Sequence, residues 1–156
     1  AFGFIQGLET VVLRMKQHCH NAQKVVEYLK NHKEVTRVIY STEHDREINE
    51  RAKIYLKGGN GPMVGIELKG GIESGKRFIE SLKMFYHVAN IGDARSLAIH
   101  PASTTHSQLN EKELEASGVT QSYVRLCIGL EHIDDIIDDL DQALNKSSKN
   151  PLKAVS

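Results

Sequence analysis

The sequence predicts an α/β domain, a two-layer sandwich in which a small, mainly antiparallel sheet carries helices on one face. Stretches with the helical period alternate along the chain with about four short β-branched stretches that predict strands. The chain has 156 residues, enough for one domain with a hydrophobic core. Its 20 Lys and Arg residues balance 20 Asp and Glu residues, so a basic surface for nucleic acid is not expected.

Residues 4–31 predict one long helix, because apolar or small side chains recur at steps of three and four. A helix of this length extends beyond a small domain. We therefore expect residues 1–31 to bridge to another domain or subunit, with a coiled coil as the alternative. His18 and His20 flank the seam and are expected to be exposed. The seam consists of Ile5, Leu8, Val12, Met15, Cys19, Ala22, Val26 and Leu29.

The middle of the chain alternates strand and helix patterns. Its glycine-rich stretch, residues 58–62, precedes a strand and not a helix, which predicts a helix stop and turn in place of a phosphate loop. The expected elements are strand 35–40, helix 43–57, strand 63–68, helix 72–85, and short strands at 87–89 and 97–99. The residues expected to face inward are Ile48, Ala52, Tyr55 and Leu56 in the first of these helices, and Ile72, Gly75, Phe78, Ile79 and Leu82 in the second.

The last third predicts a capped short helix, a strand and a final amphipathic helix. Asn110 and Glu113 form a capping-box pattern for helix 111–116, which Gly118 ends. Residues 123–128 predict a strand, and the last helix begins near Glu131. Its apolar face is Ile133, Ile136, Ile137, Leu140 and Leu144, and its acidic residues Asp134, Asp135, Asp138, Asp139 and Asp141 are expected to solvate the outer face and not to bind a metal.

We expect residues 32–145 to form the α/β domain and residues 146–156 a polar tail. Cys19 and Cys127 fall at apolar positions and are expected to be buried reduced thiols. No signal peptide and no apolar run of membrane length is visible, so a cytoplasmic protein is expected.

One loop and one strand contain the residues that suggest a binding site. Residues 90–106 lack a helical or strand period and concentrate polar side chains. Arg125 lies inside an apolar strand, where a guanidinium needs a carboxylate or phosphate partner. Two interpretations remain open for Arg125: a ligand carboxylate, or a salt bridge to an acid of the domain itself. Asn90 can donate to a carboxylate or simply shape a turn, and the hydroxyl of Thr105 can bond the local backbone.

These stretches resemble the C-terminal part of the Cys/Met-metabolism pyridoxal-phosphate enzymes. Asn in place of Ser at position 90 favours the O-acetylhomoserine sulfhydrylase branch over the lyases. The resemblance covers residues 1 to about 145. Its specific motifs are NIGDARSLAIHPASTTH at 90–106 and VRLCIGLE at 124–131, and weaker matches are QGLET at 6–10, Arg14-Met15, and IDDIIDDLDQAL at 133–144.

The resemblance implies a fold-type I enzyme, usually a homotetramer, that uses pyridoxal phosphate. It implies that Arg125 binds the substrate α-carboxylate, that Asn90 lies beside that carboxylate, and that Thr105 lies near the active site. The family's Schiff-base lysine and cofactor-binding residues lie in a large domain N-terminal to the resembling part. We therefore expect this chain to clamp the substrate, to contain no catalytic, cofactor-binding or metal-binding residue, and to be inactive alone.

Three functions remain open from the sequence. The first is a transferase that makes homocysteine or methionine from O-acetylhomoserine and a sulfur nucleophile. The second keeps the pyridoxal-phosphate enzyme but changes the reaction to that of a γ-synthase or γ-lyase acting on cystathionine or methionine. The third is a stand-alone amino-acid-binding regulatory module, in which Arg125 would serve equally well. No nucleic acid or membrane is expected as a partner in any of them.

Overall fold

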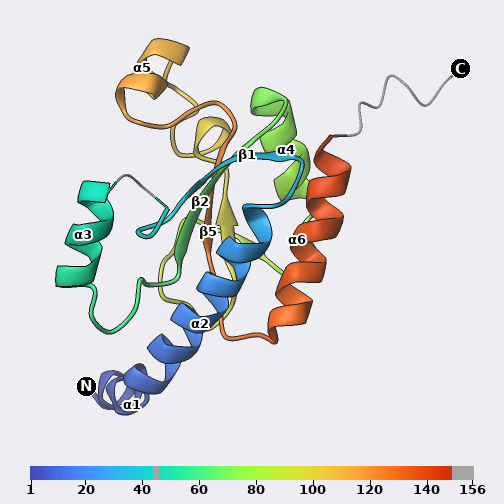
Figure 1. Ribbon diagram of the computed structural model, residues 1–156. Helices are drawn as coiled ribbons and strands as arrows, with labels where there is room; N and C mark the ends of the chain where they lie inside the picture. The colour runs from blue at the N-terminus through green and yellow to red at the C-terminus, as the bar shows by residue number, and fades with distance from the viewer. Residues whose placement is uncertain (44–45, 149–156) are drawn as a thin grey trace, which may run out of the picture.

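The computed structural model describes residues 1–43 and 46–148, and within them the chain forms one five-stranded sheet packed against helices (Figure 1). Neighbouring strands pair antiparallel except β3 and β4, which are parallel. The predicted small, mainly antiparallel sheet is confirmed. The strands, in their order across the sheet, are β1 (Val35–Ile39), β2 (Met63–Leu68), β5 (Tyr123–Cys127), β4 (Leu97–Ile99) and β3 (Tyr86–His87).

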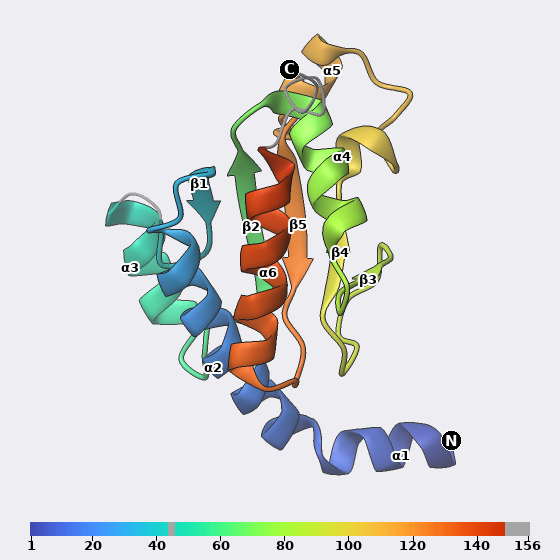
Figure 2. The same cartoon turned by 90° about the vertical axis from the view of Figure 1, so that its right-hand side faces the viewer.

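Three helices cover one face of the sheet, as Figure 2 shows from their side. They are α2 (Val11–Leu29), α4 (Gly71–Ser81) and α6 (Ile133–Ser147). On the other side of the sheet, toward β1, lies α3 (Arg46–Tyr55), while the 3-10 helix η1 (Pro101–Ser103) and α5 (Glu111–Ala116) follow β4 in the chain (Figure 1). No helix of the described residues is long and apolar enough to cross a membrane.

Alternate residues of the central strands form the core beneath these helices. Val64 and Ile66 of β2 and Val124 and Leu126 of β5 are fully buried, as the period of two along a strand requires. The helices contribute the facing layer, including Val25, Leu29, Phe78, Ile136, Leu140 and Leu144. Burial of this apolar surface is the main stabilising term of the domain.

The prediction of one helix over residues 4–31 is wrong. The chain forms α1 (Phe2–Glu9) and α2, separated at Thr10, whose backbone angles are φ −110° and ψ 2°. The apolar period continues across Thr10 and therefore does not signal the break. Only the second half of this period packs on the sheet, since α1 has no buried residue and the buried residues of α2 begin at His18. The expected exposure of His18 is also wrong: α2 lies against the turn after β5, and buried His18 Nδ1 lies 2.7 Å from the carbonyl oxygen of Ile128.

The inward face predicted for the helix at 43–57 is largely wrong. In α3 only Ala52 is buried, while Ile48 and Leu56 are exposed and Tyr55 is 78% exposed. The helix α3 lies on the side of the sheet that α2, α4 and α6 leave uncovered (Figure 1).

The helix predicted over 72–85 ends at Ser81, and the reason lies in α6. The Asp139 carboxylate accepts hydrogen bonds from the backbone N–H groups of Lys83, Met84 and Phe85 at 2.8 to 3.3 Å. These bonds replace the helical ones, and Leu82 is already extended. Asp139 itself is buried, which corrects the prediction that the acidic residues of this helix all face solvent.

The remaining local predictions agree with the structure in full or in part. Asn110 and Glu113 form the predicted capping box, with reciprocal bonds of 2.8 and 3.1 Å, and Gly118 has φ 77°. Both cysteines are free thiols, but only Cys127 is buried as predicted, whereas Cys19 is half-buried. The helix α6 continues through Ser147 into the predicted tail, and residues 149–156 of that tail lie outside the described residues.

Candidate functional site

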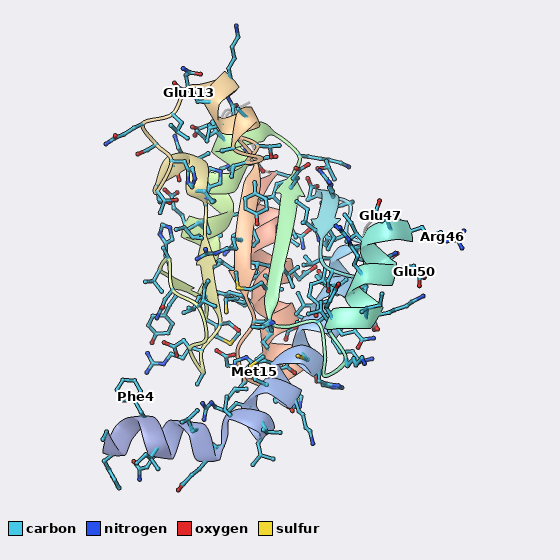
Figure 3. All side chains as sticks on the ribbon, turned by 90° about the vertical axis from the view of Figure 1, so that its left-hand side faces the viewer. Phe4, Met15, Arg46, Glu47, Glu50 and Glu113 are labelled. Atoms are coloured by element: carbon cyan, nitrogen blue, oxygen red, sulfur yellow. The ribbon has the colours of Figure 1, made fainter. Side chains whose placement is uncertain are left out.

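The candidate site lies on the sheet face opposite α2, α4 and α6, which Figure 3 views directly. Because side chains alternate along a strand, Tyr123 and Arg125 of β5 point away from the core that Val124 and Leu126 form. The register places Arg125 between Gly65 of β2 and Ile99 of β4. The guanidinium therefore projects from the middle of the sheet.

Gly65 gives this face its shape. A Cβ atom at position 65 would lie 2.7 Å from the ring of Tyr123, so the absence of a side chain lets the tyrosine ring cover the strand. Burial raises the pKa of the Tyr123 hydroxyl above its ordinary 10. Beside the ring is an open hollow of about 420 Å³, whose lining includes Arg125, Tyr123, Ile39, Asn60, Met63 and Ser41.

Arg125 is half-buried and forms no ion pair with any carboxylate of residues 1–43 and 46–148. Its Nη2 donates one long hydrogen bond, 3.5 Å, to the backbone carbonyl of Asn90. Glu67 is the acid on the same face of β2, and it pairs with Arg37 at 3.7 Å. The described residues thus contain no acid that forms the salt bridge considered as one interpretation of Arg125.

Asn90 and Arg125 come together, as the sequence predicts, but through the backbone of Asn90. Residues 88–95 form an exposed loop between β3 and β4, and the Asn90 side chain is exposed with them. Thr105 follows η1, beyond the end of β4, and its hydroxyl pairs with His106 Nδ1 at 2.8 Å. In the described residues no hydrogen bond joins Thr105 to Arg125 or Asn90.

Sequence reasoning missed a buried polar cluster at the base of the loop that carries Asn90. Ser96 donates from its backbone N–H and from its hydroxyl to the two carboxylate oxygens of Glu131, at 2.7 and 2.9 Å. The N–H of Gly129 donates to the Ser96 hydroxyl at 2.9 Å. From the sequence Glu131 is expected only near the start of the last helix and at the end of the 124–131 motif, and nothing in the spacing of the two residues signals their contact.

His100 is a second buried polar residue that holds the site's framework. Its Nε2 lies 2.8 Å from the carbonyl oxygen of Gln121, and its Nδ1 lies 2.8 Å from the Ser103 hydroxyl. Since a carbonyl oxygen only accepts, Nε2 carries the hydrogen. Burial lowers the pKa of His100 and favours the neutral ring. A Cβ at Gly75 would lie 2.4 Å from this ring, so the ring packs directly on the backbone of α4.

The fold and the site together define a mixed α/β domain in which Arg125, on the uncovered face of the sheet, pairs with no acid of the described residues. The family model described as Cys/Met metabolism PLP-dependent enzyme matches residues 1–145. The chain therefore belongs to this family, as the sequence motifs predicted.

The relatives include sulfhydrylases and a lyase. The chain is 49% identical over 145 residues to the O-acetyl-L-homoserine sulfhydrylase of Leptospira meyeri, covering 92% of this chain and 33% of the relative. It is 44% identical over 146 residues to the L-methionine gamma-lyase of Fusobacterium nucleatum subsp. polymorphum, covering 94% of this chain and 37% of the relative.

A solved structure shares the fold. It is a putative O-acetylhomoserine (thiol)-lyase from Campylobacter jejuni subsp. jejuni NCTC 11168 containing N'-pyridoxyl-lysine-5'-monophosphate, with a TM-score of 0.82 and 42% identity over 90% of this chain and 33% of that chain. The chain thus spans about a third of the length of the relatives it matches.

The described lysines do not fit a Schiff base with pyridoxal phosphate. Such a lysine needs its amine in a closed site that lowers its pKa. The lysines of residues 1–43 and 46–148 are exposed except Lys76, which is half-buried and pairs with Glu73 at 2.8 Å. What the described residues contribute to the uncovered face of the sheet is the half-buried guanidinium of Arg125 and the loop beside it.

Proposed function

We propose that this chain is the substrate-clamping C-terminal part of a pyridoxal-phosphate enzyme that makes homocysteine or methionine from O-acetylhomoserine and a sulfur nucleophile. Arg125 binds the α-carboxylate of the amino-acid substrate. The observation that supports this assignment is the half-buried guanidinium with no carboxylate partner in the described residues. A guanidinium left in such a position is satisfied by an anion that arrives with the ligand.

Pyridoxal phosphate, bound by a further domain of the enzyme, supplies the electron sink for the reaction. The contribution of this chain is orientation. Two parallel N–H groups of Arg125 bind both carboxylate oxygens and thereby fix rotation about the substrate Cα. Asn90 lies beside the bound carboxylate, because its backbone is already within 3.5 Å of Arg125. Thr105 is assigned near the active site on the family resemblance alone.

The proposal extends to the assembly and the compartment. An N-terminal pyridoxal-phosphate domain is the partner of this chain, and the complete enzyme is a cytoplasmic homotetramer. The length of the relatives, of which this chain spans about a third, supports a further domain.

Arg125→Lys in the complete enzyme tests the clamp. Lysine keeps the charge but loses the planar pair of donors, so kcat/KM for O-acetyl-L-homoserine should fall by an amount corresponding to about 2–4 kcal/mol. The melting temperature should change little, since the partner of Arg125 is a ligand. Arg125→Ala should cost more. A destabilised variant with normal kcat/KM per folded molecule would remove Arg125 from the site.

A γ-lyase is the second candidate, favoured by the 44% identity to a methionine gamma-lyase. The two reactions differ in products, so the complete enzyme should be supplied with O-acetyl-L-homoserine and sulfide and, separately, with L-methionine alone. Homocysteine from the first mixture supports the sulfhydrylase. Keto acid and ammonia from the second support the lyase.

Residues 1–156 alone should be catalytically inert and should form no Schiff base with pyridoxal phosphate. The reason is the exposure of the described lysines. Borohydride reduction followed by peptide mapping measures this directly. Stoichiometric labelling of a single lysine would contradict the assignment of the Schiff-base lysine to another domain.

A further inference from the structure

The loop that carries Asn90 is fixed to the sheet at its C-terminal end by Ser96. This serine is fully buried immediately before β4. Its carbonyl oxygen accepts from the N–H of Tyr86 at 3.0 Å, its N–H and hydroxyl donate to Glu131, and its hydroxyl oxygen accepts from Gly129. Every polar atom of Ser96 is thus paired, and the pairs join three separate segments of the chain.

Within the part of the chain that the structure describes, Glu131 binds the loop without a cationic partner. No Lys, Arg or His of the described residues lies within ion-pair distance of it, and both of its oxygens are bound by the same serine. Hydrogen bonds to an ionised acceptor are about twice as strong as neutral ones. The charge of Glu131 therefore strengthens the hydrogen bonds that attach the loop at Ser96.

The contact is built closely enough to require a glycine. A Cβ at position 129 would lie 2.2 Å from Glu131 Oε2 and 2.4 Å from the backbone nitrogen of Ser96. From the other side, Asn21 of α2 donates to the carbonyl oxygens of Gly129 and Glu131 at 3.0 Å each. The turn that carries Glu131 is therefore held from both sides, and the carboxylate has a fixed place.

This cluster lies at the end of the strand pair that carries Arg125. The register pairs Leu97 with Cys127 and Ile99 with Arg125, so Ser96 lies at the point where the ladder ends and the loop begins. Between β3 and Ser96 the loop touches Arg125 through the carbonyl of Asn90, at 3.5 Å. Its exposed residues have few bonds of their own, among them Leu130 N–H to Ala94 O at 2.8 Å. The attachment at Ser96 therefore fixes the C-terminal end of the loop that places Asn90 against the guanidinium.

We propose that Glu131 and Ser96 are positioning residues of the carboxylate clamp. They hold the Asn90 loop against Arg125 and so set the geometry in which the guanidinium receives an amino acid with a free α-carboxylate. The inference rests on the proposed function of Arg125 and adds residues that act on the substrate through the loop.

The test uses Glu131→Gln in the complete enzyme with pyridoxal phosphate bound. The amide keeps the shape and one acceptor oxygen but loses the charge and the bond from the Ser96 hydroxyl. KM for O-acetyl-L-homoserine should rise roughly tenfold, while kcat should stay within about threefold. The inhibition constant of 3-aminopropyl acetate, which lacks the carboxylate, should not change. Ser96→Ala should act in the same direction and serves as the second variant if Glu131→Gln folds poorly.

Asp139→Asn is the matched control. Asp139 is also a carboxylate that accepts backbone N–H groups, but it lies on the helix-covered side and anchors residues 83–85. It should lower the melting temperature and leave KM unchanged. If Glu131→Gln instead behaves like Asp139→Asn, or if KM for both ligands rises equally, the residue has only a structural role and the inference is overturned.

A double-mutant cycle with Arg125→Lys separates the two levels of the proposal. If Glu131 acts through the clamp, Glu131→Gln should cost much less in the Arg125→Lys background than alone. Additive losses overturn the inference and leave the function of Arg125 intact. If Arg125→Lys alone leaves KM and kcat/KM unchanged, the clamp itself is wrong, and the role of Glu131 falls with it.

Discussion

The two faces of the sheet treat buried polar groups in opposite ways. On the helix-covered face, both ring nitrogens of His100 are hydrogen-bonded and Asp139 accepts three backbone N–H groups. On the uncovered face, half-buried Arg125 has one long bond to the carbonyl of Asn90. Unpaired polar groups cost free energy when they are buried. Within the described residues, the polar groups on the covered face are paired by the domain itself, whereas the guanidinium on the other face has a single long hydrogen bond.

A single strand, β5, contributes side chains to both faces of the sheet. Alternate residues of β5 are Val124 and Leu126, fully buried under the helices, and Tyr123 and Arg125, half-buried on the other side. A substitution at one residue should therefore affect stability, and a substitution at its neighbour should affect function. This separation of the two effects is what the predictions test.

The largest effect is expected from Leu126→Ala. Leu126 is fully buried between β2 and β4 and the helices, so its truncation leaves a cavity and should lower the free energy of unfolding by about 2–5 kcal/mol. In the complete enzyme kcat/KM per folded molecule should remain near that of the wild type. Urea unfolding and active-site titration on the same preparation measure both. If Leu126→Ala lost kcat/KM while its unfolding free energy stayed unchanged, the predicted separation of stability and function between the two faces would be wrong.

The covered face was largely predictable because its signals are local. The strand at 63–68 has the predicted bounds, and the capping box at Asn110 forms as expected. The errors arise from contacts between distant residues. The helix before Leu82 ends early because Asp139 captures the next N–H groups, and the break at Thr10 lies within an unbroken apolar period that cannot signal it.

The uncovered face was predictable only in part. An Arg in an apolar strand is conspicuous, and its proximity to Asn90 is found, although through a backbone carbonyl and not the side-chain amide. Glu131 and Ser96 are separated by 35 residues, and each has an ordinary local explanation. Their contact depends on the register of β4 and β5, which periodicity does not determine. The place of Thr105 beside a substrate stays a prediction.

A second prediction concerns pH and the covered face. Burial lowers the pKa of His100 below its ordinary 6.5, so below that pH the unfolded chain takes up a proton that the folded chain does not. The contribution of His100 to the unfolding free energy is therefore fully present above about pH 6.5 and is lost as the pH falls toward the folded-state pKa of His100. The slope contributed by this residue is at most about 1.4 kcal/mol per pH unit.

Urea unfolding of the wild type and His100→Gln at pH 7.5, 6.5 and 5.5 measures this contribution. Glutamine does not titrate, so the difference in unfolding free energy between the two proteins should shrink as the pH falls. A difference that stays constant over this range would mean that folded His100 takes up its proton as readily as the unfolded chain does.

The smallest effect on stability is expected where apolar side chains pack on nothing in the domain. Along α1 and the first half of α2 the apolar residues are exposed, Leu8 by 69% and Val12 by 63%. Figure 3 shows Phe4 and Met15 on this segment, which extends beyond the end of the sheet. The exposed apolar residues of the segment are Phe2, Phe4, Ile5, Leu8, Val12, Leu13 and Met15. Many exposed apolar side chains on one segment are typical of an interface, as the expected bridging role of residues 1–31 requires.

Leu8→Lys combined with Val12→Lys should leave the unfolding free energy of the isolated chain within about 0.5 kcal/mol, because neither side chain is buried in the domain. The wild-type chain should self-associate at high concentration through these exposed residues, and the double variant should weaken that association by roughly tenfold or more. Sedimentation equilibrium measures it, with Tyr55→Lys as the control, since Tyr55 is 78% exposed but lies on α3, away from residues 1–15. The control should associate like the wild type. A wild-type chain that stays monomeric at high concentration would show that these exposed residues do not drive association. It would contradict the prediction that residues 1–15 form an interface.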